Sequence, residues 1–549
     1  MLPYVRGGRE LETKWAIAQG EENVENYTEN EYAKYRALID KGNNFYETEN
    51  YEEAIKCYDK AIQLCETAET KFFVLINWGI ELSKLAKTNE NEDLFQKAFE
   101  KYAETVRLCE ADSDIIVVLS FWGNALYDLA KIKQNESSFK DALDKYNEAI
   151  EKEDNSYVLI KQGIVLANLA VIKQDLDLYK KATQSFKKTG ESILEIFSYF
   201  DKEEAELIIK TGVLYPLLNL DTEDGKFFNE AIKDISPEEL EKYKEIYVRS
   251  VFVISRLRIN REYETSVAHY TKKIIAQELL FNKSKFRLNA INNSNDPTEG
   301  KILLDYLFKD KPSKEEKLDT EYRAFVGCFT FKLDNLSQFR LYGKDQNQEG
   351  TGLSLVFHEN FFSRKLKMAT KKSNNKLEKP SIYSVFGYKD EDEDKKYTLF
   401  RCIYIDQKEQ QVKTVGQSEI TNEKYKEYID DVFHIVNEKM EKLRNLIQNT
   451  DLKQNVIGQL LINLRYLTKH IAFKEEQECR IVRICSINEK GKIHFDKEKM
   501  FIEYESDVIP RIEKIYFGPK ATNMELFEDR LKIELNRKIK CKKSENPLA

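Results

Sequence analysis

The sequence has few prolines and only scattered cysteines, and both scarcities limit what it encodes. Of its 549 residues, 9 are proline and 8 are cysteine, and no two cysteines form a Cys-x-x-Cys pair. The spacing predicts neither a disulfide framework nor a zinc site, and it favours a reducing, cytoplasmic setting. The five histidines, at positions 269, 358, 434, 470 and 494, have no metal-ligand spacing either, so we expect no bound metal.

Long apolar runs are also missing. No stretch of about 18 apolar residues occurs, so we expect no membrane-spanning helix. The first residues, Met1–Arg6, lack the apolar stretch of a signal peptide. No Walker loop, His-Glu-x-x-His motif or Gly-x-Ser-x-Gly motif occurs, which removes the commonest signatures of nucleotide hydrolases, zinc proteases and serine hydrolases. The composition, 33% charged and 41% hydrophobic, suits a soluble globular protein with two or three domains.

Charge is unevenly distributed along the chain. Residues 1–260 hold 34 Lys and Arg against 49 Asp and Glu, whereas residues 261–549 hold 53 against 46. The first part is therefore acidic and the second mildly basic. Solvated surfaces explain this most simply. The alternative is that the acidic part receives a basic partner or folds back on the basic part. The basic part also leaves nucleic-acid binding open, although no recognised module appears.

A repeat runs from about residue 38 to residue 190. A glycine, an alanine and an aromatic residue recur, and the alanines are separated by 44, 44 and 40 residues. This period predicts stacked helical hairpins, an architecture that usually binds something. The recurring residues are Gly42, Ala54, Tyr58 and Ala61; Gly79, Ala98 and Tyr102; Gly123, Ala142, Tyr146 and Ala149; and Gly163, Ala182 and Phe186.

The first unit, GNNFYETENYEEAIKCYDKAIQLCE, resembles a tetratricopeptide repeat (TPR). The resemblance implies that Gly42 permits close helix approach and that Tyr58 fills the gap between units. We expect an N-terminal extension (1–35), then a TPR-like solenoid with capping helices (36–260) that holds a protein or peptide in its groove. A purely architectural spacer is the alternative. The polar segments Ala86–Asp93 and Ala130–Ser137 are expected to form long turns. Ser236 and Pro237 are expected to begin a terminal helix with a capping box.

Beyond residue 260 the pattern changes to short strands mixed with helices. Residues 261–549 therefore predict an α+β domain. The expected helices are Lys273–Phe281, Glu423–Ile447 and Leu452–Ala472, and residues 364–396 are expected to form a mobile insertion. The strand-like runs are TSVAHYT, FRLNA, AFVGCFTF, GLSLVF, LFRCIYI, CRIVRI and IEKIYFG. The fold class is thus an all-α solenoid followed by an α+β domain.

The order of four short motifs resembles a bacterial family known only as domain of unknown function 2971. The motifs are His269-Tyr270-Thr271, Asn295-Asp296-Pro297 with Glu299, Tyr342-Gly343, and Glu476, Glu478 and Arg480. The resemblance covers most of residues 265–525. Phe339 and Cys479 depart from it, because a tryptophan and another aromatic residue are usual at those places.

The same residues resemble, more distantly, the His-Tyr-Glu arrangement of ADP-ribosyltransferases. That resemblance implies NAD as the substrate, with Glu476 or Glu478 stabilising positive charge on the ribose. His269 would anchor the other ribose, and Tyr270 or Tyr342 would stack on nicotinamide. Arg287 or Arg480 would hold the pyrophosphate with a planar fork. By analogy, the setting would be a bacterial effector, toxin or defence protein.

Each of these residues also has a structural interpretation. His269 on an apolar strand is equally consistent with a hydrogen-bonded core histidine. Strand alternation places Glu476, Glu478 and Arg480 on one face, where they would form an ion pair. The competing hypothesis is therefore a non-catalytic adaptor whose two domains both bind macromolecules. The transferase hypothesis requires His269, Tyr342 and a glutamate to line one cleft.

Overall fold

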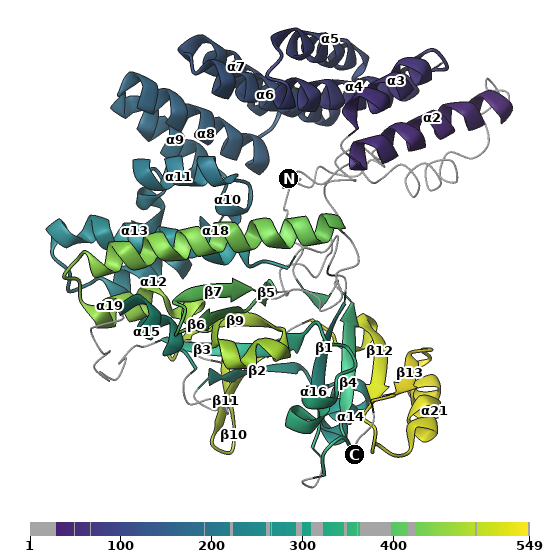
Figure 1. Cartoon of the computed structure of the whole chain (residues 1–549), viewed down its shortest axis with the longest axis vertical. Helices are drawn as coiled ribbons and strands as arrows, with labels where there is room; N and C mark the ends of the chain where they lie inside the picture. Colours follow the sequence, from purple (N-terminus) through teal and green to yellow (C-terminus); the bar gives the residue numbers. More distant parts are fainter. Residues whose placement is uncertain are drawn as a thin grey trace. The chain divides into compact units, whose positions relative to one another are not determined.

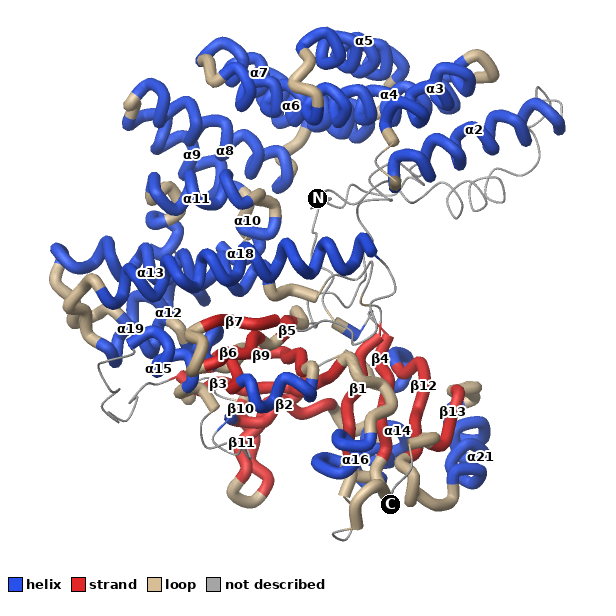
Figure 2. The backbone as a smooth tube through the Cα atoms, viewed as in Figure 1, coloured by secondary structure: helices blue, strands red, loops and turns tan. Residues whose placement is uncertain are grey.

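The computed structural model divides the chain into two compact units, which are described separately. One unit comprises the N-terminal helices to residue 192 together with residues 199–217, and the other comprises residues 193–198 and most of the chain from 218 onward. Strands occur in the second unit, whereas the first is built from helices (Figure 2). The structure describes residues 29–48, 50–65, 67–191, 193–219, 223–259, 264, 266–291, 299–308, 322–344, 348–358, 361–362, 397–414, 423–488, 491–504 and 506–546.

Four helical hairpins form most of the first unit, so the predicted solenoid is confirmed (Figure 1). Consecutive helices pair as α2 with α3, α4 with α5, α6 with α7 and α8 with α9. Side chains of Asn50, Asn91, Asn135, Asn155 and Asp175 cap helix N-termini. The helices are α2 (Glu29–Glu47), α3 (Tyr51–Ile62), α4 (Ala68–Thr88), α5 (Glu92–Leu108), α6 (Asp112–Lys133), α7 (Glu136–Lys152), α8 (Ser156–Lys173), α9 (Leu176–Lys188) and α11 (Lys202–Thr211).

The recurring glycine and aromatic residues meet within each hairpin. A Cβ atom on Gly123 would lie 2.6 Å from a ring carbon of Tyr146, and one on Gly163 would lie 2.7 Å from Phe186. Gly42 and Gly79 make the equivalent approach to Tyr58 and Tyr102. Real Cβ atoms do not approach other atoms this closely, so these helix pairs depend on glycine. The glycine and aromatic residues that recur in the sequence are thus the residues that pack against each other within each hairpin.

Three details of the predicted solenoid were wrong. The polar segments after Leu85 and Leu129 do not form long turns, because α4 continues to Thr88 and α6 to Lys133. The terminal helix α13 (Pro237–Arg256) begins after Ser236 as expected, but the Ser236 side chain does not cap the backbone. Helix α13 also belongs to the second unit rather than closing the first.

Two helices of the first unit are long and apolar enough to cross a membrane by composition alone. In α6 and α8, 61% and 67% of the most apolar window is buried inside the protein. Each lies within a hairpin, where it packs on α7 or α9 respectively. Packing within the solenoid therefore accounts for their apolar character.

The second unit contains a ten-stranded sheet covered by short helices. Its main path is β10-β11-β2-β3-β1-β4-β12-β13, and β9 pairs with both β3 and β5. Each of the seven strand-like runs of the sequence overlaps at least one strand, and LFRCIYI is interrupted at Cys402. The strands are β1 (Ser266–Thr271), β2 (Phe286–Ala290), β3 (Tyr322–Thr330), β4 (Leu353–His358), β5 (Phe400–Arg401), β9 (Glu478–Ser486), β10 (Ile493–Asp496), β11 (Lys499–Tyr504), β12 (Ile512–Phe517) and β13 (Lys540–Lys543).

Helices and 3-10 turns complete this unit. Helices α14 and α18 match the predictions closely. The predicted insertion at 364–396 lies outside the described residues. The elements are α10 (Ile193–Ser198), η1 (Tyr215–Asn219), α12 (Glu223–Ala231), α14 (Lys273–Phe281), α15 (Ile302–Phe308), α16 (Leu336–Tyr342), α18 (Glu423–Gln448), α19 (Gln454–Leu460), α20 (Ile462–Arg465), η5 (Ile471–Glu476), η6 (Ile509–Arg511) and α21 (Met524–Leu535).

A second, three-stranded sheet corrects the prediction of one long helix over Leu452–Ala472. The segment breaks into α19 and α20 and then enters strand β8 (Thr468–His470). Strand β8 runs parallel to β6 (Ile403–Asp406), which also pairs with β7 (Gln411–Thr414). The change matters for the site, because β8 carries Lys469, which reaches Glu478 of β9 and Glu476 of η5.

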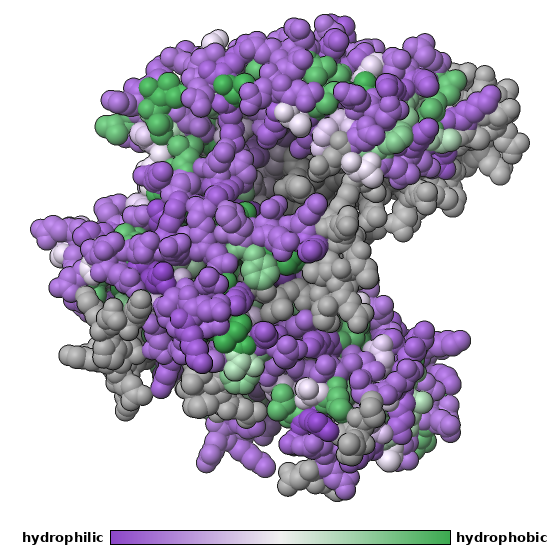
Figure 3. Space-filling model, viewed as in Figure 1, coloured by the Kyte–Doolittle hydropathy of each residue, from purple (hydrophilic) through white to green (hydrophobic). Residues whose placement is uncertain are grey.

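The large sheet has one strongly apolar face and one mixed face. The main core covers the first face and includes Phe325, Phe329, Leu355 and Ile481. On the other face, Tyr270, Phe339 and Val356 form a smaller apolar cluster beside polar residues of β3 and β9. The surface seen in Figure 3 is largely hydrophilic, with separate apolar spots rather than one continuous patch.

Candidate functional site

A cluster of buried charges lies on the mixed face of the sheet, where β3 and β9 pair. Three carboxylates and two cations form it, and we call it the carboxylate cluster. Each of the five charged side chains is no more than 11% exposed. Buried charges are costly unless they are paired, so this arrangement strongly constrains the local structure. Its members are Glu299, Lys469, Glu476, Glu478 and Arg480.

Strand alternation brings two members of the cluster together. Glu478 and Arg480 are two residues apart in β9, so both side chains lie on the same face. Their register partners in β3 are Thr330 and Cys328. Gln477, with φ at 44°, turns the chain between η5 and β9, and Glu476 immediately precedes it. The sequence therefore predicted the shared position of Glu478 and Arg480 correctly, whereas Glu476 lies in η5 and not on the strand, so alternation does not explain its place beside them.

Glu478 is the most fully paired carboxylate of the cluster. Its Oε1 accepts from Arg480 Nε at 2.8 Å, and its Oε2 accepts from Arg480 Nη2 at 2.9 Å and from Lys469 Nζ at 2.6 Å. Burial raises the pKa of Glu478, but the attraction of Arg480 and Lys469 outweighs it and holds the pKa well below its usual range. Glu478 is therefore ionised and saturated with donors.

Arg480 is equally occupied. Its Nη1 donates to the Tyr466 carbonyl at 2.8 Å and pairs with Glu299. Burial lowers the pKa of Arg480, but Glu478 and the other acidic groups around it, Glu299 among them, together raise it by more, so the guanidinium stays charged. All three guanidinium nitrogens thus have protein partners. This geometry indicates that Arg480 stabilises the carboxylate cluster. It does not favour the predicted role of Arg480 in binding a pyrophosphate.

Glu476 is the carboxylate of the cluster that meets an exposed aromatic ring. Lys469 binds Oε2 of Glu476, while the Tyr342 hydroxyl donates to Oε1 at 3.2 Å. Tyr342 is 41% exposed, whereas Glu476 is 9% exposed. Burial of the hydroxyl and the negative charge of Glu476 raise the pKa of Tyr342, so it remains a donor at neutral pH. A solvent-facing ring and a buried carboxylate therefore share one hydrogen bond.

Cys328 reaches solvent from the middle of the sheet. Strand β3 pairs with β1 only through Thr330 and with β2 only through Phe325 and Val326, all along the same edge. Gly327–Phe329 therefore lie at a split between β1 and β2. Surrounding protein and Glu478 raise the pKa of the Cys328 thiol well above its usual value, so it is neutral.

The structure does not bring His269 to the carboxylates. Its register partner is Leu355, which lies in the main apolar core, and its ring packs on Phe286 and Phe329 at 4.9 and 5.8 Å. Its Nδ1 lies 2.9 Å from the Cys328 carbonyl oxygen. Burial lowers the pKa of His269, partly offset by that contact, so the ring is neutral. His269 thus has the environment of a core histidine at the split, on the opposite face from Glu478.

Two other predicted binding residues also lie apart from the cluster. The Tyr270 hydroxyl donates to the Lys332 carbonyl at 2.8 Å, and its ring packs on Phe339. Arg287 lies on β2, where it pairs with Asp496 at 2.8 Å and covers the Phe501 ring at 4.2 Å. These contacts fix the ends of neighbouring elements. The Asn295-Asp296-Pro297 segment lies outside the described residues, whereas Glu299 contributes to the cluster.

Sequence reasoning missed Lys469, which joins the two glutamates. The segment around it appeared to be an amphipathic helix, so its side chain had no predicted direction. Pairing of β8 with β6 sets Lys469 opposite Tyr404, whose hydroxyl accepts from the Glu478 backbone N–H at 2.9 Å. The run Thr468–His470 is too short to show strand alternation in the sequence. Across the described residues, no group of His, Cys, Asp and Glu has the geometry to hold a metal.

Comparison with protein families adds to this geometry. The model of the family described as "Protein of unknown function (DUF2971)" matches residues 338–481, and a tetratricopeptide repeat model matches residues 35–68. The chain contains a tetratricopeptide repeat and a DUF2971 domain. The DUF2971 match runs from α16 to β9, so it includes Tyr342, Lys469 and both glutamates of the cluster. No curated protein and no solved structure matches the chain.

Proposed function

We propose that this protein joins a peptide-binding repeat domain to an enzyme that transfers ADP-ribose from NAD. Tetratricopeptide repeats generally mediate protein–protein interaction, which supports the first part. The second part is supported by one observation above all, the contact between the exposed Tyr342 ring and the buried Glu476 carboxylate. The biological setting that we propose, by analogy only, is a bacterial effector, toxin or defence protein.

The chemistry of the proposed transfer needs a carboxylate beside a sugar. The bond between the ribose C1′ and the nicotinamide nitrogen breaks, and its electron pair leaves with nicotinamide. Positive charge then develops on the ribose, and a neighbouring carboxylate lowers its energy. An acceptor nucleophile forms the new bond to C1′ and loses its proton. Glu476 is the proposed stabilising carboxylate, and the Tyr342 ring is the proposed stacking surface for nicotinamide.

Glu478 has a different part in this proposal. Arg480 and Lys469 saturate its oxygens, so it has little capacity left for a sugar cation. We assign Glu478 and Arg480 to positioning, because their pairing fixes the strand that follows Glu476. His269, Tyr270 and Arg287 are left out of the proposed binding surface because their contacts lie elsewhere.

The competing proposal is a non-catalytic adaptor, and the saturation of the cluster favours it. A network in which Lys469 and Arg480 satisfy Glu478 is what a purely structural ion cluster requires. The adaptor hypothesis predicts that no nucleotide binds at Tyr342. The transferase hypothesis predicts that NAD binds there and is consumed.

Nucleotide binding separates the two hypotheses. Isothermal titration of the full chain with NAD should give saturable heat, and NAD should raise the melting temperature. Tyr342→Ala should weaken binding at least tenfold, while Tyr322→Ala, a tyrosine on β3 that packs on Phe227, should leave it unchanged. Absence of binding by the folded wild-type protein at millimolar NAD would favour the adaptor.

The proposed repeat partner is testable through charge. Residues 1–260 carry 15 more acidic than basic side chains, so a basic peptide segment is the expected ligand. Peptides of equal length with opposite net charge should differ in affinity, and the preference should fade at high salt. Equal binding of both peptides would contradict this part of the proposal.

A further inference from the structure

A row of positive side chains marks one edge of the large sheet. Strand β13 ends the strand order, so no strand of the described residues pairs with its outer backbone edge. Residues 537–543 have the sequence RKIKCKK, with five cations and no carboxylate. We call this row and its neighbour on β12 the basic edge. Its members are Lys514, Arg537, Lys538, Lys540, Lys542 and Lys543.

Register gathers the lysines of the basic edge. Strand β13 runs parallel to β12, and the pairing sets Lys540 beside Lys514 and Lys542 beside Tyr516. Alternation places Lys540 and Lys542 on one face, while Cys541 packs on the main core from the other. Neighbouring positive charges repel one another, so this grouping is unfavourable unless an anion joins it.

Within the described part of the chain, the lysines of the basic edge have no carboxylate partner. No ion pair involves Lys538, Lys540, Lys542 or Lys543, and all four side chains are exposed. The adjacent helix α21 behaves differently. There, Arg530 pairs with Glu534 and Lys532 pairs with Asp529, three or four residues along the helix.

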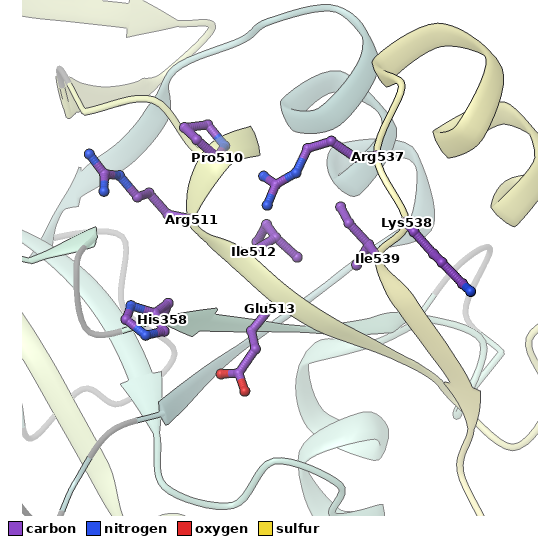
Figure 4. Close-up of a pocket in the computed structure, with 8 residues that line it drawn as sticks. All are labelled: His358, Pro510, Arg511, Ile512, Glu513, Arg537, Lys538 and Ile539. Atoms are coloured by element: carbon purple, nitrogen blue, oxygen red, sulfur yellow. The ribbon is translucent and has the colours of Figure 1, made fainter. Parts of the chain in front are cut away.

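A cavity of about 380 Å³ extends this positive surface at the start of β13. Arg511, Arg537 and Lys538 contribute three cations to its lining, against the single carboxylate of Glu513. Glu513 also accepts from the Ser266 hydroxyl at 2.9 Å. Figure 4 shows the Arg537 guanidinium extending over Ile512, while Arg511 and Lys538 point to opposite sides. Arg511 and Lys538 therefore diverge, and the Arg537 guanidinium donates to the Ile509 carbonyl, so the three cations do not converge within the cavity.

We propose that the basic edge is a docking surface for the phosphate backbone of a nucleic acid. Successive residues of a strand rise by about 3.3 Å, so Lys540 and Lys542 are about 6.6 Å apart along an extended line. A linear array suits a linear polyanion better than it suits a small phosphate ligand. Lysine contacts phosphate as a point charge without reading bases, and in the described chain no aromatic side chain of β12 or β13 is more than partly exposed. The binding is therefore independent of base sequence and sensitive to salt.

Fluorescence anisotropy with a labelled 20-nucleotide RNA and the matching DNA duplex tests this proposal. Replacing Lys538, Lys540, Lys542 and Lys543 by glutamine should weaken binding at least tenfold at 50 mM salt. The slope of log affinity against log salt should fall by about 3. The matched control replaces four ion-paired, at least partly exposed lysines of the same unit by glutamine: Lys285, Lys413, Lys442 and Lys532. It should retain most of the affinity.

Three outcomes would overturn the proposal. Wild-type protein that binds neither nucleic acid at 50 mM salt contradicts it outright. Equal losses in the two quadruple variants would show that net charge, and not the basic edge, is responsible. Binding to anionic phosphatidylserine vesicles without binding to nucleic acid would assign the basic edge to membranes. Circular dichroism and thermal melts of both variants establish that they are folded.

Discussion

The Tyr342 hydroxyl donates to Oε1 of Glu476 at 3.2 Å, which links a ring that is 41% exposed to a carboxylate that is 9% exposed. Helix α16 supplies the tyrosine and η5 supplies the glutamate, 134 residues later in the chain. In the proposed transfer the ring stacks on nicotinamide and the carboxylate stabilises the ribose cation. The two groups can therefore be tested independently.

Two substitutions at Tyr342 should have different kinetic effects if the proposed transfer occurs. Tyr342→Phe removes the hydrogen bond but keeps the ring, so kcat should fall several-fold while KM for NAD changes little. Tyr342→Ala also removes the stacking surface, so KM should rise at least tenfold. Steady-state nicotinamide release measures both constants. Identical kinetic constants for the two variants would contradict the assigned role of the ring.

The carboxylate cluster should be essential to stability whatever the activity is. Arg480→Met leaves Glu478 and Glu299 buried with fewer cations, and it should lower the free energy of unfolding of the second unit by about 3–5 kcal/mol. Lys413→Met, which removes an exposed pair with Glu409, should cost less than about 1 kcal/mol. Urea unfolding monitored by circular dichroism gives both values, and equal losses would refute the distinction.

Acid should weaken the same cluster. The pKa of Glu478 is held below the ordinary glutamate value of 4.5 in the folded protein. The stability that ionised Glu478 adds to the folded protein is therefore fully present above pH 4.5. It is lost as the pH falls from 4.5 toward the pKa of Glu478 in the folded state. Glu478→Gln should flatten the decline in stability below pH 4.5. Parallel acid profiles for wild type and variant would show that Glu478 contributes little.

The hairpin glycines should not tolerate a methyl group. Gly123→Ala places a Cβ 2.6 Å from the Tyr146 ring and should destabilise the repeat unit by about 1–3 kcal/mol, although alanine favours a helix. Ser137→Ala, at an exposed position of α7, is the matched control and should change stability by less than about 0.5 kcal/mol. If the Gly123→Ala protein has the same melting temperature as the wild type, the hairpin accommodates the added methyl group without loss of stability, which contradicts this prediction.

Glu81 should make the repeat unit sensitive to alkaline pH. It is 1% exposed in α4, and burial raises its pKa from 4.5 to about 9. The folded protein therefore holds a proton that the unfolded chain releases above pH 4.5, so stability falls as the pH rises from there toward 9. Glu81→Gln should remove this dependence and raise the free energy of unfolding at pH 8 by up to about 5 kcal/mol relative to wild type. Glu100→Gln, on the exposed side of α5, is the matched control and should leave the dependence of stability on pH unchanged.

Much of the fold could be predicted because local patterns specify it. The glycine–aromatic spacing predicted the hairpins, since one residue of each kind must meet its partner in every unit. Strand alternation likewise placed Glu478 and Arg480 together. Both predictions depend on short stretches of sequence in which the period of the helix or strand determines which side chains share a face.

The rest depended on contacts that no local pattern reveals. His269 lies on the apolar face because β1 pairs with β4 in a register that sets it beside Leu355. Lys469 enters the cluster because the short strand β8 pairs with β6, far earlier in the chain. The segment around it has the composition of a helix, and tertiary pairing overrides that preference. The sequence thus indicated that Glu478 and Arg480 lie together, and it missed their partner Lys469.

Nicotinamide release from NAD by wild type, Glu476→Gln and Glu475→Gln tests the central claim most directly. Glu475 is adjacent to Glu476 but its side chain is 76% exposed, so it is a matched control. We predict release by the wild type and by Glu475→Gln, and a loss of at least a hundredfold in a folded Glu476→Gln. No release by the wild type, or equal release by all three proteins, would contradict the account.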